Sequence, residues 1–127
     1  MRRNDRRQVQ GRQGEQSAEE FLRAQGYTIL ARNYRVAFGE IDIIAQDRQT
    51  LVFVEVRTHG GDTFGDPLES VNPRKQRQIA KAALHYLSRN NLLEREARFD
   101  VIGIQWHDRQ ARVTHIKSAF ELPRSWA

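Results

Sequence analysis

The clearest structural signal in the sequence is residues 39–57, which read GEIDIIAQDRQTLVFVEVR. Two runs rich in Ile, Val and Phe flank a short polar segment, a pattern typical of two strands joined by a turn. If the turn centres on Arg48 and Gln49, counting outwards along the hairpin places Asp42 opposite Glu55. The two side chains then project from the same face of the sheet.

Helical and strand patterns on either side of this hairpin indicate one mixed sheet flanked by helices. Apolar periodicity predicts a first helix over 13–25, and Asn72 followed by Pro73 predicts the start of a second helix that ends at Asn90 and Asn91. The expected strands are 27–32, 40–45, 51–56, 98–106 and 112–117. The order helix, three strands, helix, two strands predicts an α/β or α+β fold with a crossover helix.

The chain has 127 residues, 39% of them hydrophobic, which suits a single domain with a modest core. We expect residues 1–12 to form a basic, flexible tail, residues 13–120 the domain, and residues 121–127 a C-terminal tail. The Gly-rich segment 57–70 shows no periodicity, and we expect it to be a long loop.

The charge balance suggests an acidic partner. The formal net charge is +5, and of the 21 basic residues all but three, Lys75, Lys81 and Lys117, are Arg. The absence of cysteine excludes a disulfide framework, a thiolate zinc site and a Cys nucleophile. No apolar run is long enough to cross a bilayer, so we expect a cytoplasmic protein without a membrane partner.

Asp42 and Glu55 are carboxylates inside otherwise apolar strands. On a covered face, ionised carboxylates cost several kcal/mol unless they are compensated, and like charges opposite each other repel. A divalent cation between them removes the conflict, and all-oxygen ligation suits Mg²⁺ or Mn²⁺. The alternation of side chains along the strand also places Arg57 beside Glu55. Two carboxylates with a neighbouring cation are the minimal set of groups for metal-assisted phosphodiester hydrolysis. The alternative is an exposed strand face with a Glu55–Arg57 surface ion pair.

A second group of basic residues points to nucleic-acid binding. Positions 74, 77 and 81 share one face of the second predicted helix, and an arginine cluster opens the chain. Such a surface recognises the phosphates and the shape of a nucleic acid rather than its base sequence. For the arginine cluster, the alternative is a solvated tail. The residues expected to contact phosphate are Arg3, Arg7, Arg12, Arg74, Arg77 and Lys81.

Five segments in this order resemble the YraN-like family of small bacterial proteins: GEQSAEEFLRAQGYTILARNYR, GEIDIIA, LVFVEVR, VNPRKQRQIAKAALHYL and RFDVIGI. That family is similar to Holliday-junction resolvases of the PD-(D/E)XK nuclease superfamily, and the match runs from about Gly11 to Ile104. The resemblance implies a restriction-endonuclease-like core, a metal-dependent phosphodiesterase site with Asp42 and Glu55 as metal ligands, and a homodimer. It also implies a supporting role for Glu15 as a third candidate metal ligand; the alternative is an exposed residue at a helix start.

The chain departs from the superfamily pattern where Arg57 replaces a Lys. A guanidinium stays protonated at working pH and cannot take a proton from water, although it can hold a phosphate. Lys75, matched to a Lys in the family, is a candidate to supply the missing ammonium; its alternative is a solvated helical Lys. For Asp100 we expect a structural role, accepting hydrogen bonds from Arg98 or a neighbouring helix.

Three functions remain open. The first is a metal-dependent endonuclease that acts on DNA in preference to RNA, including branched or structured DNA. The second is a non-catalytic nucleic-acid-binding protein that retains the nuclease fold. The third is a small scaffold whose acidic strands are exposed to solvent. The four His residues show no metal-ligand spacing, and we expect them to be packing or solvent-facing residues.

Overall fold

The computed structural model describes residues 3–59 and 67–121, and for residues 3–10 and 69 only the backbone. Its helices and strands follow the predicted order, with a short 3-10 helix, η1, added before the second helix. The elements are α1 (Arg3–Ala24), β1 (Thr28–Val36), β2 (Gly39–Asp47), β3 (Thr50–His59), η1 (Pro67–Ser70), α2 (Pro73–Arg89), β4 (Ala97–His107) and β5 (Gln110–Phe120).

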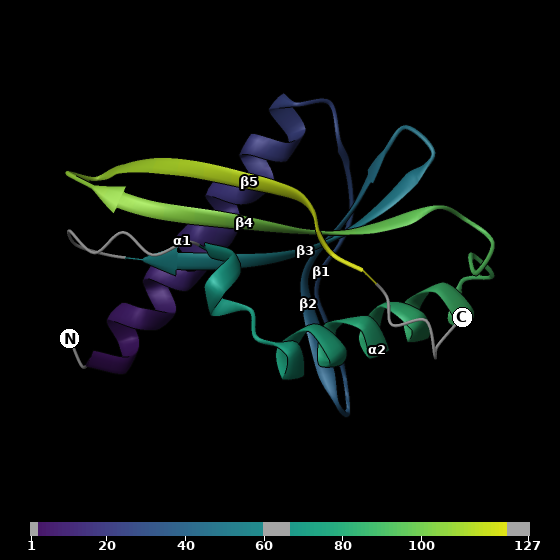
Figure 1. Cartoon of the computed structure of the whole chain (residues 1–127). Helices are drawn as coiled ribbons and strands as arrows, with labels where there is room; N and C mark the ends of the chain where they lie inside the picture. Colours follow the sequence, from purple (N-terminus) through teal and green to yellow (C-terminus); the bar gives the residue numbers. More distant parts are fainter. Residues whose placement is uncertain (1–2, 60–66, 122–127) are drawn as a thin grey trace.

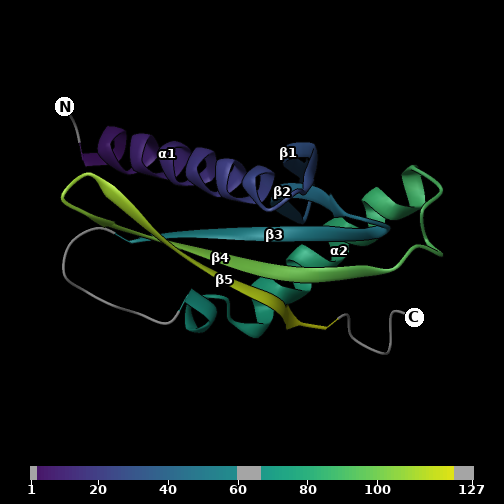
Figure 2. The same cartoon turned by 90° about the horizontal axis from the view of Figure 1, so that it is seen from above.

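The strands form one five-stranded sheet in the order β1-β2-β3-β4-β5. Only the β3–β4 pair is parallel, and α2 lies in the crossover between these two strands. Helix α1 covers one face of the sheet and α2 the other (Figures 1 and 2). The predicted mixed sheet flanked by helices is therefore confirmed, and this architecture is consistent with a restriction-endonuclease-like core.

The core has two layers because successive strand residues point to opposite faces of the sheet. On the α1 side, Leu22 packs with Val54 and Ile102, whereas on the α2 side Phe53 packs with Ile79. All five side chains are at most 1% exposed. Strand β3, buried on both faces, is the centre of the domain.

Helix α1 is longer than predicted. It begins at Arg3, so residues 3–12, expected to be a flexible tail, continue the helix. Arg and Gln, which dominate this segment, are good helix formers, and an interior glycine such as Gly11 costs only about 1 kcal/mol. At the other end, Gly26 has a φ of 93°, which suits a residue just beyond a helix C-terminus.

The predicted helix start at Asn72 is confirmed. The Asn72 side chain accepts a hydrogen bond from the Lys75 backbone N–H at 2.9 Å, and Pro73 is the first residue of α2. Of the expected loop at 57–70, the first residues extend β3 to His59 and the last form η1. The remainder of this loop lies outside the described residues.

Candidate active site

The carboxylates lie where β2 and β3 stop pairing. The predicted register is confirmed from Asp47 opposite Thr50 as far as Ile43 opposite Val54, and the next residues on the two strands are Asp42 and Glu55. There, Asp42 Oδ2 accepts a hydrogen bond from the Val56 backbone N–H at 2.8 Å. The Asp42 side chain thus takes the place of a backbone partner at this fork.

The alternation of β2 is interrupted at Asp42. Ile41 and Ile43 would share a face in a regular strand, yet Ile41 packs in the α2-side layer and Ile43 in the α1-side layer. On β1, Asn33 lies between the residues paired with these two and has a φ of 50°, in the left-handed region that Asn tolerates. This irregularity places Asp42 between the two layers.

Asp42 and Glu55 are buried, with 7% and 4% of their surface exposed, so the alternative of an exposed acidic face is wrong for this pair. Burial raises the pKa of Asp42, although the Val56 N–H and the charge of Lys75 oppose the shift. Burial and the neighbouring charge of Asp42 raise the pKa of Glu55 to about 8. At neutral pH, the metal-free pair therefore favours holding a proton.

Two cations face the same carboxylate oxygen. Lys75 Nζ and Arg57 Nε each lie 3.7 Å from Glu55 Oε1. Arg57 also donates a hydrogen bond from Nη2 to the Ser70 carbonyl at 2.8 Å, which ties β3 to η1. The structure thus brings all four residues predicted as catalytic, Asp42, Glu55, Arg57 and Lys75, to one place, here called the carboxylate pair with its two cations.

The second oxygen of Glu55, Oε2, is buried and has no hydrogen-bond partner among the described residues. Buried polar atoms are almost always paired, so this oxygen has unused capacity to bind a donor or a cation. Among the side chains that the structure describes, which exclude those of residues 3–10 and 69, no group of three or more His, Asp or Glu residues could hold a metal ion. Mg²⁺ commonly uses one or two carboxylates and completes its shell with water and phosphate oxygens, so the pair fits such an ion.

Glu15 reaches the Asp42 side of the site because α1 crosses β3 closely. A Cβ atom on Gly14 would lie 2.2 Å from Thr58 Oγ1, so this crossing requires glycine. Glu15 is half-buried and lines, together with Asp42 and Arg12, a cavity of about 130 Å³. Burial and the charge of Asp42 raise the pKa of Glu15. Glu15 is thus a neighbour of the pair, and not a third ligand in this geometry.

Most of the residues expected to contact nucleic acid are on the surface. Arg74, Arg77 and Lys81 are exposed on the outer side of α2, opposite its buried face, as their spacing predicts. Arg12 is exposed near the site, whereas the side chains of Arg3 and Arg7 lie outside the described ones.

Comparison with known proteins identifies the family of this chain. The model of the family described as "Uncharacterised protein family UPF0102" matches residues 14–104, which include β1 to α2 and most of β4. The chain belongs to the UPF0102 family. This is also the YraN-like family that the sequence resembles.

Several bacterial relatives align over almost their whole length. A UPF0102 protein from Desulfosudis oleivorans is 48% identical over 117 residues, which is 92% of this chain and 94% of the relative. One from Geotalea uraniireducens is 50% identical over 113 residues, 88% of this chain and 89% of the relative. One from Persephonella marina is 46% identical over 114 residues, 90% of this chain and 95% of the relative.

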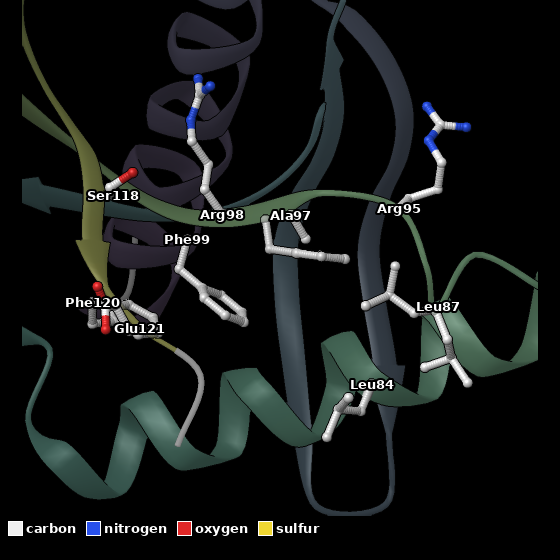
Figure 3. A pocket seen from close by; sticks show the side chains of 11 residues that line it. Leu84, Leu87, Arg95, Ala97, Arg98, Phe99, Ser118, Phe120 and Glu121 are labelled. Carbon is white, nitrogen blue, oxygen red and sulfur yellow. The ribbon is translucent and has the colours of Figure 1, made fainter. Parts of the chain in front are cut away.

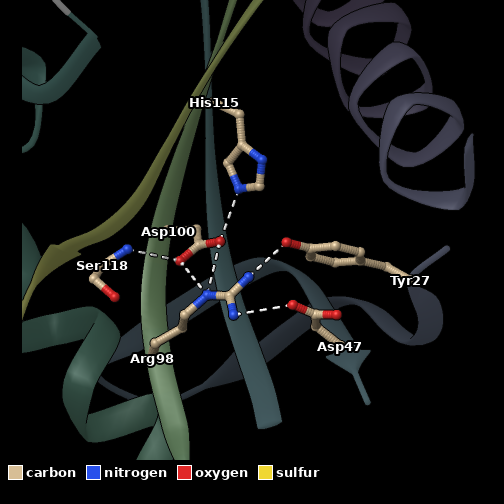
Figure 4. A network of polar contacts seen from close by, with 6 residues as sticks. All are labelled: Tyr27, Asp47, Arg98, Asp100, His115 and Ser118. Carbon is tan, nitrogen blue, oxygen red and sulfur yellow. Dashed lines mark hydrogen bonds and ion pairs between the residues drawn. The ribbon is translucent and has the colours of Figure 1, made fainter. Parts of the chain in front are cut away.

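A third buried carboxylate in this UPF0102 protein, Asp100, is the centre of a polar network (Figure 4). Its side chain, 0% exposed, accepts hydrogen bonds from Arg98 Nε at 3.1 Å and from the Ser118 backbone N–H at 3.0 Å. His115 Nε2 lies 2.7 Å from its other oxygen. Arg98 extends the network by donating to Tyr27 and Asp47.

These contacts explain why the pKa of Asp100 is lowered. Burial alone would raise its pKa, but the hydrogen bonds from His115, from the Ser118 N–H and from Arg98 outweigh burial and lower it. The predicted bond from Arg98 is present. The contact of His115 with Asp100 was not predicted, because it depends on the pairing of β4 with β5 across an irregularity between Phe99 and Val101.

A larger hollow, of about 760 Å³, lies away from the carboxylate pair, between α2 and the ends of β4 and β5. Figure 3 shows Phe99, Leu84 and Leu87 around it, whereas Arg95 and Arg98 point away. The guanidinium of Arg95 is held by the Gln49 carbonyl. Because both guanidinium groups point away from it, this hollow does not offer the pairing of carboxylates with cations found at Asp42 and Glu55.

No helix in the described part of the UPF0102 chain is both long and apolar enough to span a membrane.

Proposed function

We propose that this protein is a metal-dependent nuclease that hydrolyses phosphodiester bonds in DNA. The observation that carries the proposal is the buried pair Asp42 and Glu55, with Glu55 Oε1 facing two cations and Glu55 Oε2 buried without a hydrogen-bond partner among the described residues. A fold gains no stability from such an arrangement, whereas a site that must receive a cation and a phosphate requires it.

Each residue of the pair and its cations has a distinct task. Asp42 and Glu55 would hold Mg²⁺ or Mn²⁺, which when bound polarises a phosphate oxygen and acidifies water. Arg57 is anchored to the Ser70 carbonyl, so its guanidinium is positioned to stabilise charge on the phosphate. Lys75 carries the ammonium that can hold or release a proton, a task that Arg57 cannot perform.

The surface next to the site suits a nucleic-acid backbone. Helix α2 carries five basic residues, namely Arg74, Lys75, Arg77, Lys81 and Arg89, and no acidic residue. Its N-terminal turn presents Lys75 to Glu55, so a phosphate backbone that follows α2 leads directly to the carboxylate pair.

A second candidate is a nucleic-acid-binding protein that retains this fold without catalysis. This candidate is favoured because groups of the protein itself already contact both carboxylates. Asp42 accepts a hydrogen bond from the Val56 N–H, and Glu55 is ion-paired with Lys75. The absence of a three-ligand group among the described residues agrees with this candidate.

Calorimetric titration of Mn²⁺ separates the two candidates. The wild type is compared with the double variant Asp42→Asn, Glu55→Gln, each in the presence of a short DNA duplex that is not cut. The matched control is Glu94→Gln, Glu96→Gln, which makes the same charge change at two exposed residues. Thermal melting of all three proteins checks that they fold.

The nuclease proposal requires Mn²⁺ binding by the wild type and the control, and none by the Asp42, Glu55 variant. It further requires that the two Mn²⁺-binding proteins cleave linear, forked or four-way DNA. Equal binding by all three proteins, or no cleavage of any substrate, would leave the non-catalytic candidate. In that case DNA binding persists in the double variant and weakens with salt.

A further inference from the structure

Phe38 is an exposed aromatic residue beside the basic helix. It lies in the short turn between β1 and β2, and 51% of its surface is exposed. Together with Lys81, Leu84 and His85 of α2 it lines a shallow hollow of about 650 Å³. Single exposed aromatic residues are common on protein surfaces, so the neighbours of Phe38 decide whether it can form part of a binding site.

The turn that carries Phe38 is held firmly on α2. A Cβ atom on Gly39 would lie 2.4 Å from the Gln78 carbonyl oxygen, so the backbone next to Phe38 is seated directly on the helix. Further along the hairpin, Tyr34 packs edge-on against Tyr86 and its hydroxyl hydrogen-bonds His85 Nδ1. The backbone that carries Phe38 is therefore fixed on α2, which limits the backbone entropy lost when Phe38 binds a partner.

The basic side chains around this aromatic group form a continuous line. Arg74, Arg77, Lys81 and His85 are exposed on α2 at intervals of three or four residues, so they follow one side of the helix. We call these four residues the basic stripe. It begins next to Lys75, which contacts Glu55, and it ends at the hollow lined by Phe38.

We propose that Phe38 stacks on an unpaired base of a DNA strand whose phosphates follow the basic stripe. The inference rests on the proposed function, since it takes DNA as the ligand of the same surface. Positive charge with an aromatic platform is the combination that binds unpaired nucleotides, and base stacking contributes about 1–3 kcal/mol per base.

The geometry also places the unpaired base relative to the carboxylate pair. An α-helix advances 1.5 Å per residue, so Lys81 lies about 9 Å along the axis of α2 from Lys75. With a rise of about 3.4 Å per nucleotide in duplex DNA, this corresponds to roughly three nucleotides. A base stacked on Phe38, which lines the same hollow as Lys81, would thus lie roughly three nucleotides along the strand from a phosphate held by Lys75, a spacing that branched or bulged DNA can offer.

Binding is measured in metal-free buffer, so that cleavage plays no part. The probe is a short duplex with one unpaired fluorescent adenine analogue, whose emission falls when it stacks, and the comparison is the same duplex fully paired. The variants are Phe38→Leu, which keeps an apolar side chain without a ring, and Phe38→Trp, which keeps an aromatic one. Leu93→Ala, at an exposed apolar residue just beyond α2, is the control.

Phe38→Leu should lower affinity for the bulged duplex roughly 5- to 100-fold and reduce the fluorescence quenching, with a change of less than about twofold for the paired duplex. Phe38→Trp and Leu93→Ala should bind like the wild type. The proposal is overturned if Phe38→Leu binds both duplexes as the wild type does. It is also overturned if sedimentation shows that Phe38→Leu only dissociates a dimer, because the aromatic surface would then join two copies of this chain.

The outcomes also separate this proposal from the proposed function. Wild-type protein that binds neither duplex at low salt contradicts both proposals, since neither then has a DNA ligand. Binding of both duplexes with no effect of Phe38→Leu contradicts the stacking proposal alone. Failure of Mn²⁺ binding and of cleavage, with a normal Phe38 effect, contradicts catalysis and leaves the stacking surface in place.

Discussion

Two groups of buried carboxylates in one sheet differ in how completely they are compensated. Asp100 is surrounded by Arg98, His115 and the Ser118 N–H, and its pKa is lowered. The pair Asp42 and Glu55 shares fewer donors, one of its oxygens has no partner among the described residues, and the pKa of Glu55 is raised to about 8. Both groups are at most 7% exposed, so burial alone does not explain the difference.

The difference separates a carboxylate that is compensated within the fold from a pair that is only partly compensated. A carboxylate whose pKa is lowered by the fold stabilises the folded state, whereas one whose pKa is raised destabilises it when ionised. Natural proteins keep the second kind mainly where a ligand completes the site. The comparison therefore identifies the fork of β2 and β3, and not the Asp100 network, as the place where chemistry is expected.

The largest effect is expected for Asp100→Ala. Removal of the carboxylate takes away the partner of His115 and of the Ser118 N–H and leaves Arg98 with only Asp47 and Tyr27 among the described residues. Loss of one member of a buried charged group costs about 3–5 kcal/mol. Urea unfolding followed by circular dichroism measures the loss, with Glu94→Ala at an exposed residue as the control. A loss below about 1 kcal/mol for Asp100→Ala would remove the distinction drawn between the two groups.

Glu55→Gln should have the opposite effect on stability and stabilise the folded, metal-free protein. Because the folded state raises the pKa of Glu55 from 4.5 to about 8, its ionisation costs stability that is absent below pH 4.5, grows as the pH rises and is complete above about 8. The free energy of unfolding of the variant, relative to that of the wild type, should therefore rise by about 1–4 kcal/mol between acid and alkaline pH. Urea unfolding over this pH range tests it, and a variant that loses relative stability as the pH rises contradicts the prediction.

Mn²⁺ binding at neutral pH should release about one proton, because the metal-free pair favours holding one and metal ligands must be deprotonated. Calorimetry in two buffers with different ionisation enthalpies measures the number released. The number should fall towards zero above pH 8, and Asp100→Asn should leave it unchanged. Proton release that does not vary with pH would show that the metal binds elsewhere.

The smallest effect is expected for Arg57→Lys. The variant loses the hydrogen bond from Arg57 Nη2 to the Ser70 carbonyl, which is worth about 1 kcal/mol, and keeps a positive charge beside Glu55. Thermal melting should show a decrease of this size, while Mn²⁺ affinity stays within about threefold of wild type. A loss comparable to that of Asp100→Ala would mean that Arg57 is mainly a structural residue, like Arg98.

Local chemistry predicted the parts of this molecule that depend on neighbouring residues. The turn at Arg48 and Gln49 sets the register of β2 and β3, and Asn72 with Pro73 starts α2, because turns and helix caps are decided within a few residues. The same local reasoning selected Asp42 and Glu55, since carboxylates between Ile and Val residues contradict the strand pattern around them. It failed at the start of α1, where a charged segment reads as a tail although its residues favour a helix.

The sequence by itself therefore determined the order of the elements, the hairpin register and the identity of the two carboxylates, because short-range periodicity and turn chemistry encode them. Only the tertiary structure decided that Lys75 contacts Glu55, that His115 completes the Asp100 network and that Phe38 lies beside α2. These contacts join residues at least 15 positions apart, where packing of whole elements and not local preference sets the distance. Whether a buried carboxylate is compensated, and hence whether it is structural or functional, depends on such long-range neighbours.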